Sequence, residues 1–203
     1  MTSLRDFIDT LPPDEILRVP TPVALDNVPS ALVMELEKEN RSPVIYLESA
    51  EGADMPVVVN LFGDRRRIAR IAGVEPEEFY PAWGRILANP ISPRIVSSGP
   101  AQEQVHIGDD VDCTTLPINR HFDGDGGPYI NAGVLVCKDP DTGVRNLSYQ
   151  RMLLKGPNRF TANLFSLGDI WEHLNRVAAR GSNLEVAVVI GAPPAFYLAA
   201  AAK

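Results

Sequence analysis

Proline and glycine interrupt this sequence so often that a bundle of long helices is excluded. The 203 residues include 18 prolines and 15 glycines, and both residue types tend to end or bend regular elements. Short helices and strands joined by defined turns are therefore favoured. Hydrophobic residues make up 45% of the chain, which is enough to bury the core of one domain, or of one domain with a small appendage.

The first ninety residues alternate between helical and strand patterns. Helices are predicted over 3–11, 29–39, 65–72 and 76–87, and strands over 15–19, 44–47 and 56–62. Ser3 is placed to cap the first helix, and Gly73 follows the third helix, where glycine favours termination. Alternating strands and helices are typical of an α/β arrangement.

The middle of the chain is richer in strand patterns. Runs of β-type residues occur at 104–107, 115–118, 129–137, 146–154 and 160–164. The turn D-P-D-T-G at 139–143 joins two of these runs and predicts a hairpin. The spacing of the runs favours an antiparallel sheet or a small barrel. A helix over 170–179, a buried strand over 186–190 and a helix over 195–202 are predicted to follow.

The net charge of −7 argues against nucleic acid or an anionic membrane as a general partner, because both select basic surfaces. No internal apolar run reaches the roughly 18–20 residues of a membrane helix, and the charged first eleven residues do not form a secretory signal. Cys113 and Cys137 are too few for a disulfide framework or a zinc cluster, so they are predicted to be free thiols. The sequence therefore predicts a cytoplasmic protein.

Several polar clusters have both an ordinary and a functional interpretation. The arginines at 65–67 and 70 either bind a phosphate at a helix N-terminus or form a solvated helix face, and the second is favoured because the known nucleotide motifs are missing. The acidic residues of 109–112 are favoured as turn formers over cation ligands. The glycines around Asp123 and Asp125 indicate a backbone that approaches another group closely. The three histidines show no metal-site or hydrolase spacing and are favoured as structural residues.

The segment N-L-S-Y-Q-R-M at 146–152 is the most informative one. On a strand, Asn146 and Ser148 share one face, and Tyr149 and Arg151 share the other. Methionine and two leucines follow Arg151, which predicts apolar surroundings for its guanidinium. A buried guanidinium needs an anion, such as a carboxylate, a phosphate or a substrate acid. The alternative is an exposed arginine at a sheet edge.

Taken in order, five segments resemble the N-terminal part of the UbiD-like decarboxylases, which use prenylated FMN. They are S-L-R-D-F-I-D-T-L, M-P-V-V-V-N-L-F-G-D-R-R-R-I-A, L-P-I-N-R-H-F-D-G-D-G-G-P-Y-I-N-A-G, K-D-P-D-T-G-V-R-N-L-S-Y-Q-R-M and A-V-V-I-G-A-P-P-A. The resemblance implies an α+β fold, with an α/β N-terminal segment over 1–94 and a split β-barrel, related to flavin-binding domains, over 95–203. It also implies decarboxylation of an aromatic or α,β-unsaturated carboxylic acid, with the carbanion chemistry carried by the flavin.

The resemblance also implies roles for five residues. Arg151 matches the arginine that faces the flavin and the substrate carboxylate. Asn146 matches the asparagine that helps to hold Mn²⁺ or Mg²⁺ on the cofactor phosphate. Ser148 and Tyr149 match cofactor-lining positions, and Asn131 stands where a threonine beside the flavin is common.

The chain departs from the family at three points. Leu167 stands about where the metal-binding histidine is expected, and leucine cannot coordinate a cation. Ser166, also a candidate cofactor-binding residue, and Asp169 are the neighbours that could replace it. The family's other metal-binding and acid–base residues are glutamates beyond the G-A-P-P segment, in a part that this sequence does not include. The large C-terminal domain that usually mediates oligomerisation is also missing from it.

Two functions are consistent with these patterns. The leading hypothesis is a component of a UbiD-like decarboxylase that binds prenylated FMN or FMN and a small aromatic or unsaturated acid. Its acidic catalytic residues would lie on a second subunit or on a longer parent chain, and the alanine-rich helix with which the sequence stops supports this expectation. The alternative is a non-catalytic flavin-binding or assembly protein of the same fold, which Leu167 favours. An interaction module without flavin is a weaker third possibility.

Overall fold

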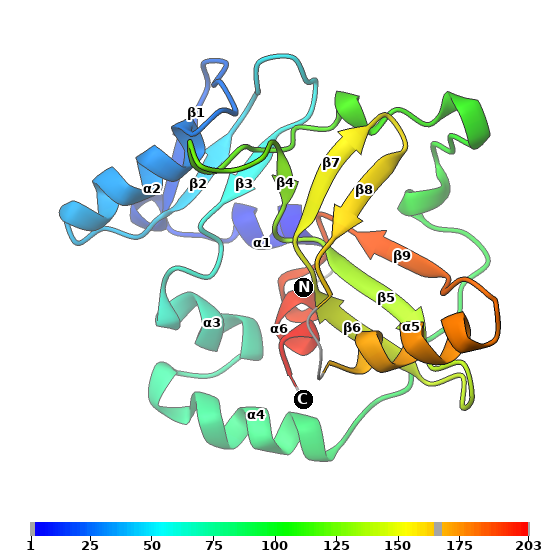
Figure 1. Cartoon of the computed structure of the whole chain (residues 1–203). Coiled ribbons are helices and arrows are strands. Elements are labelled where there is room, and N and C mark those ends of the chain that lie inside the picture. The colour runs from blue at the N-terminus through cyan, green and yellow to red at the C-terminus, as the bar shows by residue number, and fades with distance from the viewer. Residues whose placement is uncertain (1–2, 165–167, 203) are drawn as a thin grey trace.

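The computed structural model describes residues 3–164 and 168–202 (Figure 1). Its first half contains α1 (Leu4–Asp9), β1 (Ile16–Val19), α2 (Val28–Lys38), β2 (Val44–Leu47), β3 (Val57–Val59), α3 (Arg65–Ala72) and α4 (Phe79–Ala88). The three strands form one sheet in the order β1-β2-β3, in which β1 is parallel and β3 antiparallel to β2. A parallel pair needs a crossover connection, and α2 provides it.

The predicted ends of two helices in this half are confirmed. The Ser3 hydroxyl caps α1 by accepting the backbone N–H of Asp6 at 3.0 Å. Gly73 ends α3 in the left-handed conformation with φ of 75°, which glycine adopts without the penalty of a Cβ atom. The predicted strand at 56–62 is shorter than expected, because only Val57–Val59 pairs with β2.

The second half contains two small antiparallel sheets. Its elements are β4 (Tyr129–Ile130), β5 (Val134–Lys138), β6 (Arg145–Tyr149), β7 (Met152–Gly156), β8 (Arg159–Ala162), α5 (Asp169–Ala179), β9 (Val186–Val189) and α6 (Pro194–Ala200). The sheet orders are β4-β7-β8 and β6-β5-β9. Among the described residues no strand pairing joins the two sheets, so they do not form a closed barrel. The predicted mixture of helices and sheets is confirmed, and the split barrel stays a prediction.

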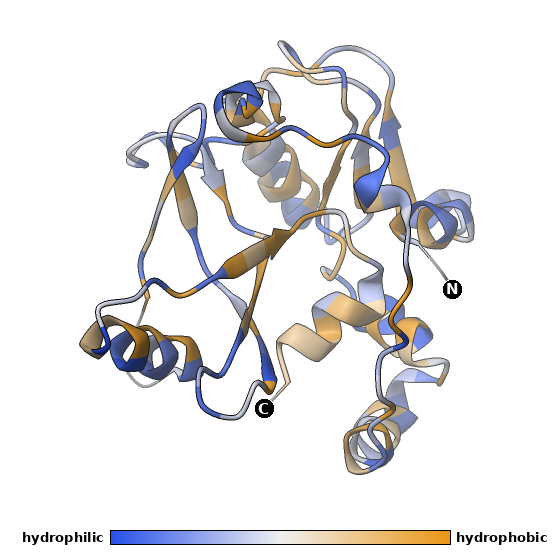
Figure 2. Ribbon diagram, turned by 90° about the vertical axis from the view of Figure 1, so that its right-hand side faces the viewer, coloured by the Kyte–Doolittle hydropathy of each residue, from blue (hydrophilic) through white to orange (hydrophobic). Residues whose placement is uncertain are grey.

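The two sheets share a hydrophobic core with α5. Ile130 and Met152 come from one sheet, Leu135 and Cys137 from the other, and Ile170 from the helix. The strands carry much of the hydrophobic sequence (Figure 2), and each strand turns alternate residues toward this core. The core therefore fixes which face of each sheet points inward.

The opposite face of the sheet β6-β5-β9 packs against α6. Val134 of β5 forms a buried cluster with Tyr197 and Ala200 of this helix, and Leu61 and Phe62 from the first half pack against the same cluster. The first half of the chain thus contacts the second half around α6.

Several predicted strands of the second half are wrong or differently placed. Residues 104–107 and 115–118 form no strand, and Val105 and Ile107 are exposed. The run 129–137 divides into β4 and β5, and the run 146–154 divides into β6 and β7. At both divisions the chain passes from one sheet to the other. The alternation of hydrophobic and polar residues does not reveal such a division, because it does not show with which distant strand a segment pairs. The hairpin turn at 139–143 is confirmed, because β5 and β6 pair around it.

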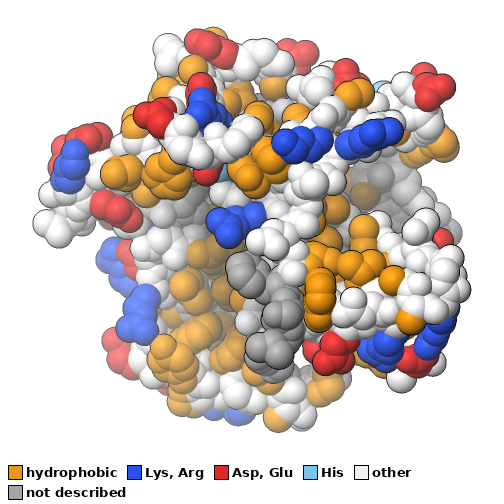
Figure 3. Space-filling view, in the orientation of Figure 1, with side chains coloured by type: hydrophobic (Ala, Val, Ile, Leu, Met, Phe, Trp, Pro, Cys, Tyr) orange, Lys and Arg blue, Asp and Glu red, His pale blue; other side chains and the backbone are white. Residues whose placement is uncertain are grey.

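The last strand was predicted to be buried, and this prediction is wrong. Val186 and Val188 of β9 are 48% and 41% exposed, because β9 is an edge strand that pairs only with β5. Hydrophobic side chains are visible on this part of the surface in Figure 3. Among the residues that the structure describes, no helix is both long and apolar enough to cross a membrane.

The arginines of α3 are mostly held by the protein itself. Arg67 is 1% exposed, and it donates to the carbonyl oxygens of Leu61, Asn60 and Ser42 at 3.2, 3.1 and 2.6 Å. Burial lowers the pKa of this guanidinium. Arg70 forms a bidentate ion pair with Glu15. The predicted solvated helix face is therefore wrong for Arg67, which holds the 60–63 turn in place.

Candidate functional site

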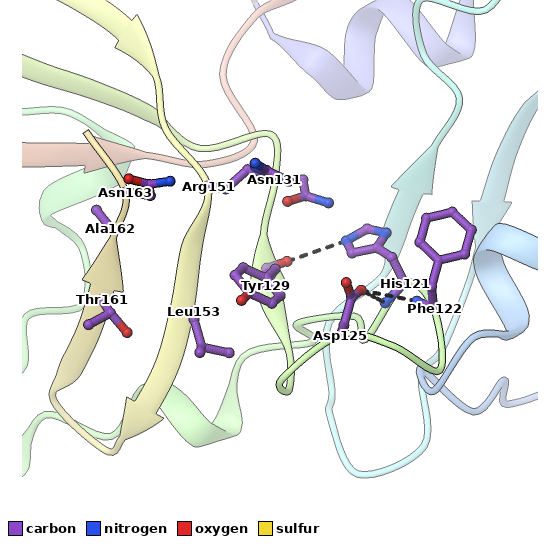
Figure 4. Close-up of a pocket in the computed structure, with 10 residues that line it drawn as sticks. All are labelled: His121, Phe122, Asp125, Tyr129, Asn131, Arg151, Leu153, Thr161, Ala162 and Asn163. Atoms are coloured by element: carbon purple, nitrogen blue, oxygen red, sulfur yellow. Dashed lines mark hydrogen bonds between the residues drawn. The ribbon is translucent and has the colours of Figure 1, made fainter. Parts of the chain in front are cut away.

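A cavity of about 400 Å³ lies on the face of the sheet β4-β7-β8 that points away from the core (Figure 4). Tyr129, Leu153 and Thr161 line its floor. They alternate along their strands with core residues such as Ile130 and Met152, so their side chains point outward. The loop that contains His121 forms the facing wall.

Asp125 fixes this loop. Its Oδ2 accepts the backbone N–H groups of His121 and Phe122 at 3.1 and 3.0 Å. The Nε2 atom of His121 lies 3.4 Å from the carbonyl oxygen of Tyr129. Asp125 therefore fixes the backbone of the loop, and the contact with Tyr129 orients the imidazole at the cavity. The phenyl ring of Phe122 is 59% exposed beside it.

The predicted close approach is found at one of the three glycines of this segment, Gly127, whereas Gly124 has open space around it. Gly127 has a φ of +150°, and a Cβ atom there would lie 3.2 Å from Cδ1 of Leu153. A side chain at this position would require Leu153 or the loop to shift by a few tenths of an ångström, in addition to the strain of the positive φ. The group that the backbone approaches is thus a side chain of β7. Asp123 of the same loop accepts a hydrogen bond from Asn27.

Arg151 enters this cavity from the connection between β6 and β7. The prediction that it is buried is wrong, because the strand is interrupted at Gln150 and Arg151 and the side chain is exposed. It has no hydrogen-bond or ion-pair partner among the described residues. Arg151 and Asn131 lie at the same end of the cavity in Figure 4. The cavity therefore presents an uncompensated positive charge beside an amide.

A second, apolar cavity of about 480 Å³ adjoins the first half of the chain. Phe62, Tyr149 and Tyr197 contribute aromatic side chains to its wall, and Asn131 lines this cavity as well as the first. The Tyr149 hydroxyl donates to the carbonyl oxygen of Tyr197 at 2.7 Å. Burial, and to a smaller degree the neighbouring Tyr197, raises the pKa of Tyr149 to about 12. The phenol is therefore neutral near pH 7, and the cavity suits a flat, weakly polar group.

Asn146 and Ser148 lie on the other face of β6, as the alternation predicts. Their cross-strand partners are Cys137 and Leu135, which belong to the core. The side chain of Asn146 hydrogen-bonds the Cys137 thiol. The Ser148 hydroxyl is buried and has no hydrogen-bond partner among the residues that the structure describes, which is uncommon for a buried polar atom.

The described residues do not assemble a metal site. No group of three His, Cys, Asp or Glu side chains within 3–164 and 168–202 is placed to hold a metal ion. Ser166 and Leu167 lie outside the described residues. Asn146 alone offers one neutral oxygen ligand, whereas Mg²⁺ and Mn²⁺ usually need charged oxygen ligands as well. The donor set of the described residues therefore does not fit a divalent cation.

The structure brings together only part of the residues singled out in the sequence. Arg151 and Asn131 share the first cavity, Tyr149 and Asn131 share the second, and Asn146 and Ser148 face the core. His121 was favoured as a structural residue, yet it also lines the cavity of Arg151. The close-approach signal of the neighbouring glycines was the one sequence feature that pointed to this loop.

Comparison with protein families agrees with this architecture. Residues 94–203 match the 3-octaprenyl-4-hydroxybenzoate carboxy-lyase Rift-related domain of UbiD, and residues 13–87 match the N-terminal domain of the same carboxy-lyase. The chain belongs to the UbiD family. Flavin-dependent decarboxylation is thus the chemistry with which its site has to be compared.

Several relatives are named decarboxylases. The anhydromevalonate phosphate decarboxylase of Methanothermobacter thermautotrophicus is 32% identical over 196 residues, which cover 97% of this chain and 44% of the relative. The phenolic acid decarboxylase of Streptomyces sp. (strain D7) is 28% identical over 219 residues, which cover 97% of this chain and 44% of that enzyme. This UbiD chain thus spans less than half the length of these curated relatives.

Solved structures of a UbiD-class enzyme and of a decarboxylase also match nearly the whole chain. An evolved dimeric form of the UbiD-class enzyme HmfF from Pelotomaculum thermopropionicum, in complex with prFMN, matches with a TM-score of 0.91 and 32% identity over 100% of this chain and 47% of that one. The vanillic acid decarboxylase ShVdcCD of Sedimentibacter hydroxybenzoicus, in closed form, matches with a TM-score of 0.89 and 25% identity, over 98% of this chain and 45% of that one.

Proposed function

We propose that this UbiD-family chain supplies the flavin-side part of a decarboxylase site. The observation that carries the proposal is Arg151, an arginine without a counter-ion among the described residues that shares a cavity with Asn131. Some arginines of this chain are paired internally, as Arg70 is with Glu15 and Arg176 with Asp139. Others, such as Arg159, are exposed without a partner among the described residues, but Arg159 does not line this cavity. An unpaired guanidinium in a concave site is suited to bind a carboxylate in a bidentate manner.

The residues present fit a phosphorylated flavin. The apolar cavity beside Tyr149 suits a flat ring system, and the buried, unpartnered hydroxyl of Ser148 needs a polar partner. We propose that Asn131, Tyr149 and Arg151 line the flavin ring. Asn146 and Ser148 lie on the core face of β6 and line neither cavity, so their assignment to the polar side of the flavin rests on the resemblance to the family. When bound, prenylated FMN would supply the electron sink that makes loss of CO₂ from the acid possible.

The chain's own residues would orient the acid and exclude water. Arg151 would hold the carboxylate through charge-assisted hydrogen bonds, and Asn131 would fix its direction. Phe122 and Leu153 present apolar surface to the same cavity, which would keep water from the reacting atoms. We propose an aromatic or α,β-unsaturated acid as the substrate, and the phenolic acid decarboxylase among the relatives supports this choice.

A free carboxylic acid is the part of the site that the described residues do not supply. Asp125 is the one carboxylate among them that lines the cavity, and its Oδ2 is occupied by two backbone N–H groups. We therefore propose that acidic residues from a second subunit, or from a further part of the same protein, complete the site. The small share of each relative that this chain covers supports this arrangement. The division into a segment over 1–94 and a cofactor-binding domain over 95–203 is part of the same proposal.

Titration with FMN and prenylated FMN tests the binding half of the proposal. We expect Arg151→Gln to weaken flavin binding about tenfold, as the loss of one charge-assisted hydrogen bond does. Arg159→Gln is the matched control, because Arg159 is an exposed arginine of β8 that does not line the cavity. Equal affinities for the two variants would refute the proposed role of Arg151.

Release of CO₂ from an aromatic acid tests the catalytic half. The chain with prenylated FMN is assayed alone and with a candidate partner that carries the missing acidic residues. We expect activity only with the partner, and full activity of the chain alone would refute the need for one.

A non-catalytic flavin-binding protein of the same fold is the second candidate. The lack of a three-ligand metal group among the described residues favours it. Flavin binding that is independent of Mn²⁺, together with no CO₂ release in the presence of any partner, would select this function over the first.

A further inference from the structure

A buried thiol and a buried imidazole lie behind Asn146. Cys137 of β5 is the direct cross-strand partner of Asn146, so both side chains project from the same face of the sheet. His173 of α5 packs against this face. Cys137 is 3% and His173 is 5% exposed. Neither side chain has a role in the function proposed above.

Four side chains form a continuous line of polar contacts. The Asn146 amide contacts the Cys137 thiol. The sulfur atom lies 3.6 Å from Nδ1 of His173, and Nε2 of the same ring lies 3.4 Å from Oδ2 of Asp139. The line therefore runs from the β5–β6 hairpin through α5 to β6, and both ring nitrogens of His173 have a partner.

Asp139 determines which atoms of this line carry a proton, because both of its carboxylate oxygens accept hydrogen bonds. Its Oδ1 accepts the backbone N–H groups of Asp141 and Thr142 at 2.8 and 3.2 Å. Arg176 contacts the same carboxylate. These backbone hydrogen bonds, together with Arg176, lower the pKa of Asp139, so the group is ionised near pH 7. An ionised carboxylate has no proton to donate.

The remaining proton positions follow one after another. Because Asp139 can only accept, Nε2 of a neutral His173 carries the proton and Nδ1 is an acceptor. The Cys137 S–H therefore donates to Nδ1. The sulfur is then left as an acceptor, so it receives an N–H of Asn146. The amide of Asn146 turns its Nδ2 toward the sulfur, and its Oδ1 points away.

We propose that Cys137 and His173, aligned by Asp139, form a relay that fixes the amide orientation of Asn146 and keeps its Oδ1 available to a ligand. The three residues are thus positioning residues for Asn146. The ligand would be a hydrogen-bond donor on the polar side of the flavin, so this last part rests on the function proposed above. The relay itself is a property of this chain and can be tested without any ligand.

The tautomer of His173 is the first test, and it needs no variant. Long-range ¹H–¹⁵N correlations of the ¹⁵N-labelled chain at neutral pH distinguish a proton on Nε2 from one on Nδ1. We expect Nε2–H for His173. A proton on Nδ1 would overturn the relay, because the thiol could then not donate to that atom.

Substitution of Asp139 provides the second test. Asp139→Asn keeps the shape of the side chain but offers an N–H to Nε2, so we expect the proton to move to Nδ1 and the side-chain amide signals of Asn146 to shift. Asp141→Asn is the matched control, since Asp141 lies in the same turn and pairs with Arg176 and Arg180 rather than with His173. Unchanged His173 and Asn146 signals in Asp139→Asn would overturn the proposal.

The thiol gives the third test. Cys137→Ser retains a donor and an acceptor at this position, whereas Cys137→Ala removes both, and Cys113→Ala is the control for a cysteine outside the relay. We expect the alanine variant at 137 to weaken FMN binding about tenfold, a typical effect of losing a positioning contact, and the serine variant to restore most of the affinity. Equal FMN affinities of the serine and alanine variants would overturn the role of the relay in binding. If the unaltered chain does not bind FMN, the proposed function fails, and the tautomer of His173 still decides the relay.

Discussion

The α3 segment and the β6–β7 connection both carry arginines, but the protein treats them in opposite ways. Around α3, Arg66 pairs with Asp64, Arg70 with Glu15, and Arg67 donates to three carbonyl oxygens. At the β6–β7 connection, Arg151 is exposed in a cavity and has no partner among the described residues. The α3 arginines stabilise the fold, whereas Arg151 is available to a ligand.

The contrast indicates that the partners of an arginine reveal its role better than its local sequence does. The cluster R-R-R at 65–67 invites a phosphate-binding interpretation, yet internal groups satisfy most of it. The single Arg151 precedes an apolar run and is nevertheless a cation that no described residue neutralises. Water solvates such an exposed charge, so the guanidinium stays free to bind an anionic ligand.

The largest expected effect comes from removing the buried guanidinium. Arg67→Met leaves the carbonyl oxygens of Ser42, Asn60 and Leu61 without their donor, so we expect the free energy of unfolding to fall by about 3 kcal/mol. Urea denaturation measures this loss. Arg65→Met is the control, because Arg65 is exposed and donates to the Tyr80 hydroxyl at the surface. Equal stability of the two variants would break the contrast between buried and exposed arginines.

The second effect tests how tightly the region behind Arg151 is packed. A Cβ atom at Gly133 would lie 2.7 Å from both Cγ2 of Ile130 and Cε of Met152, so Gly133→Ala is expected to destabilise the protein by about 2 kcal/mol. Thermal unfolding measures this change. At Gly84 of α4 an added methyl group would meet no atom within 4 Å, and Gly84→Ala is expected to add about 0.5 kcal/mol of stability. A Gly133→Ala protein as stable as the parent would show that the two sheets are not closely packed there.

The third effect separates ligand binding from stability. Arg151→Gln is expected to leave the free energy of unfolding unchanged within about 0.5 kcal/mol, while flavin binding weakens about tenfold, or by about 1.4 kcal/mol. Urea denaturation and FMN titration of the same sample give both values. A loss of stability comparable to that of Arg67→Met would mean that Arg151 is a structural residue after all.

The smallest effect is expected at alkaline pH. The pKa of Tyr149 is raised from its ordinary value of 10 to about 12, so the unfolded chain loses this proton at a lower pH than the folded one does. The contribution of Tyr149 to stability is therefore complete below about pH 10 and is lost as the pH rises from about 10 to about 12. Comparing the pH dependence of unfolding in the parent and in Tyr149→Phe measures it. Identical slopes for both proteins in this pH range would contradict the raised pKa.

The features that were predictable from the sequence depend on neighbouring residues. The cap at Ser3, the left-handed Gly73 and the hairpin turn at 139–143 involve hydrogen bonds between residues close in the chain, and these contacts leave a local signature. The faces of Asn146 and Ser148 also followed from alternation. The burial of Arg67 and the exposure of Arg151 did not, because both depend on segments distant in the chain.

The amino-acid sequence alone was enough to identify the family, the mixture of helices and sheets, and the residues from which a flavin site is proposed to assemble. Motif order, turn residues and period-two alternation carry this information, since they reflect local backbone preference. The folded structure was needed to show that the strand at 146–154 is interrupted at Arg151, that the α3 arginines are internally satisfied, and that His173 and Cys137 lie behind Asn146. Burial and hydrogen-bond partners are set by which distant segments pack together, and a single sequence does not record that choice.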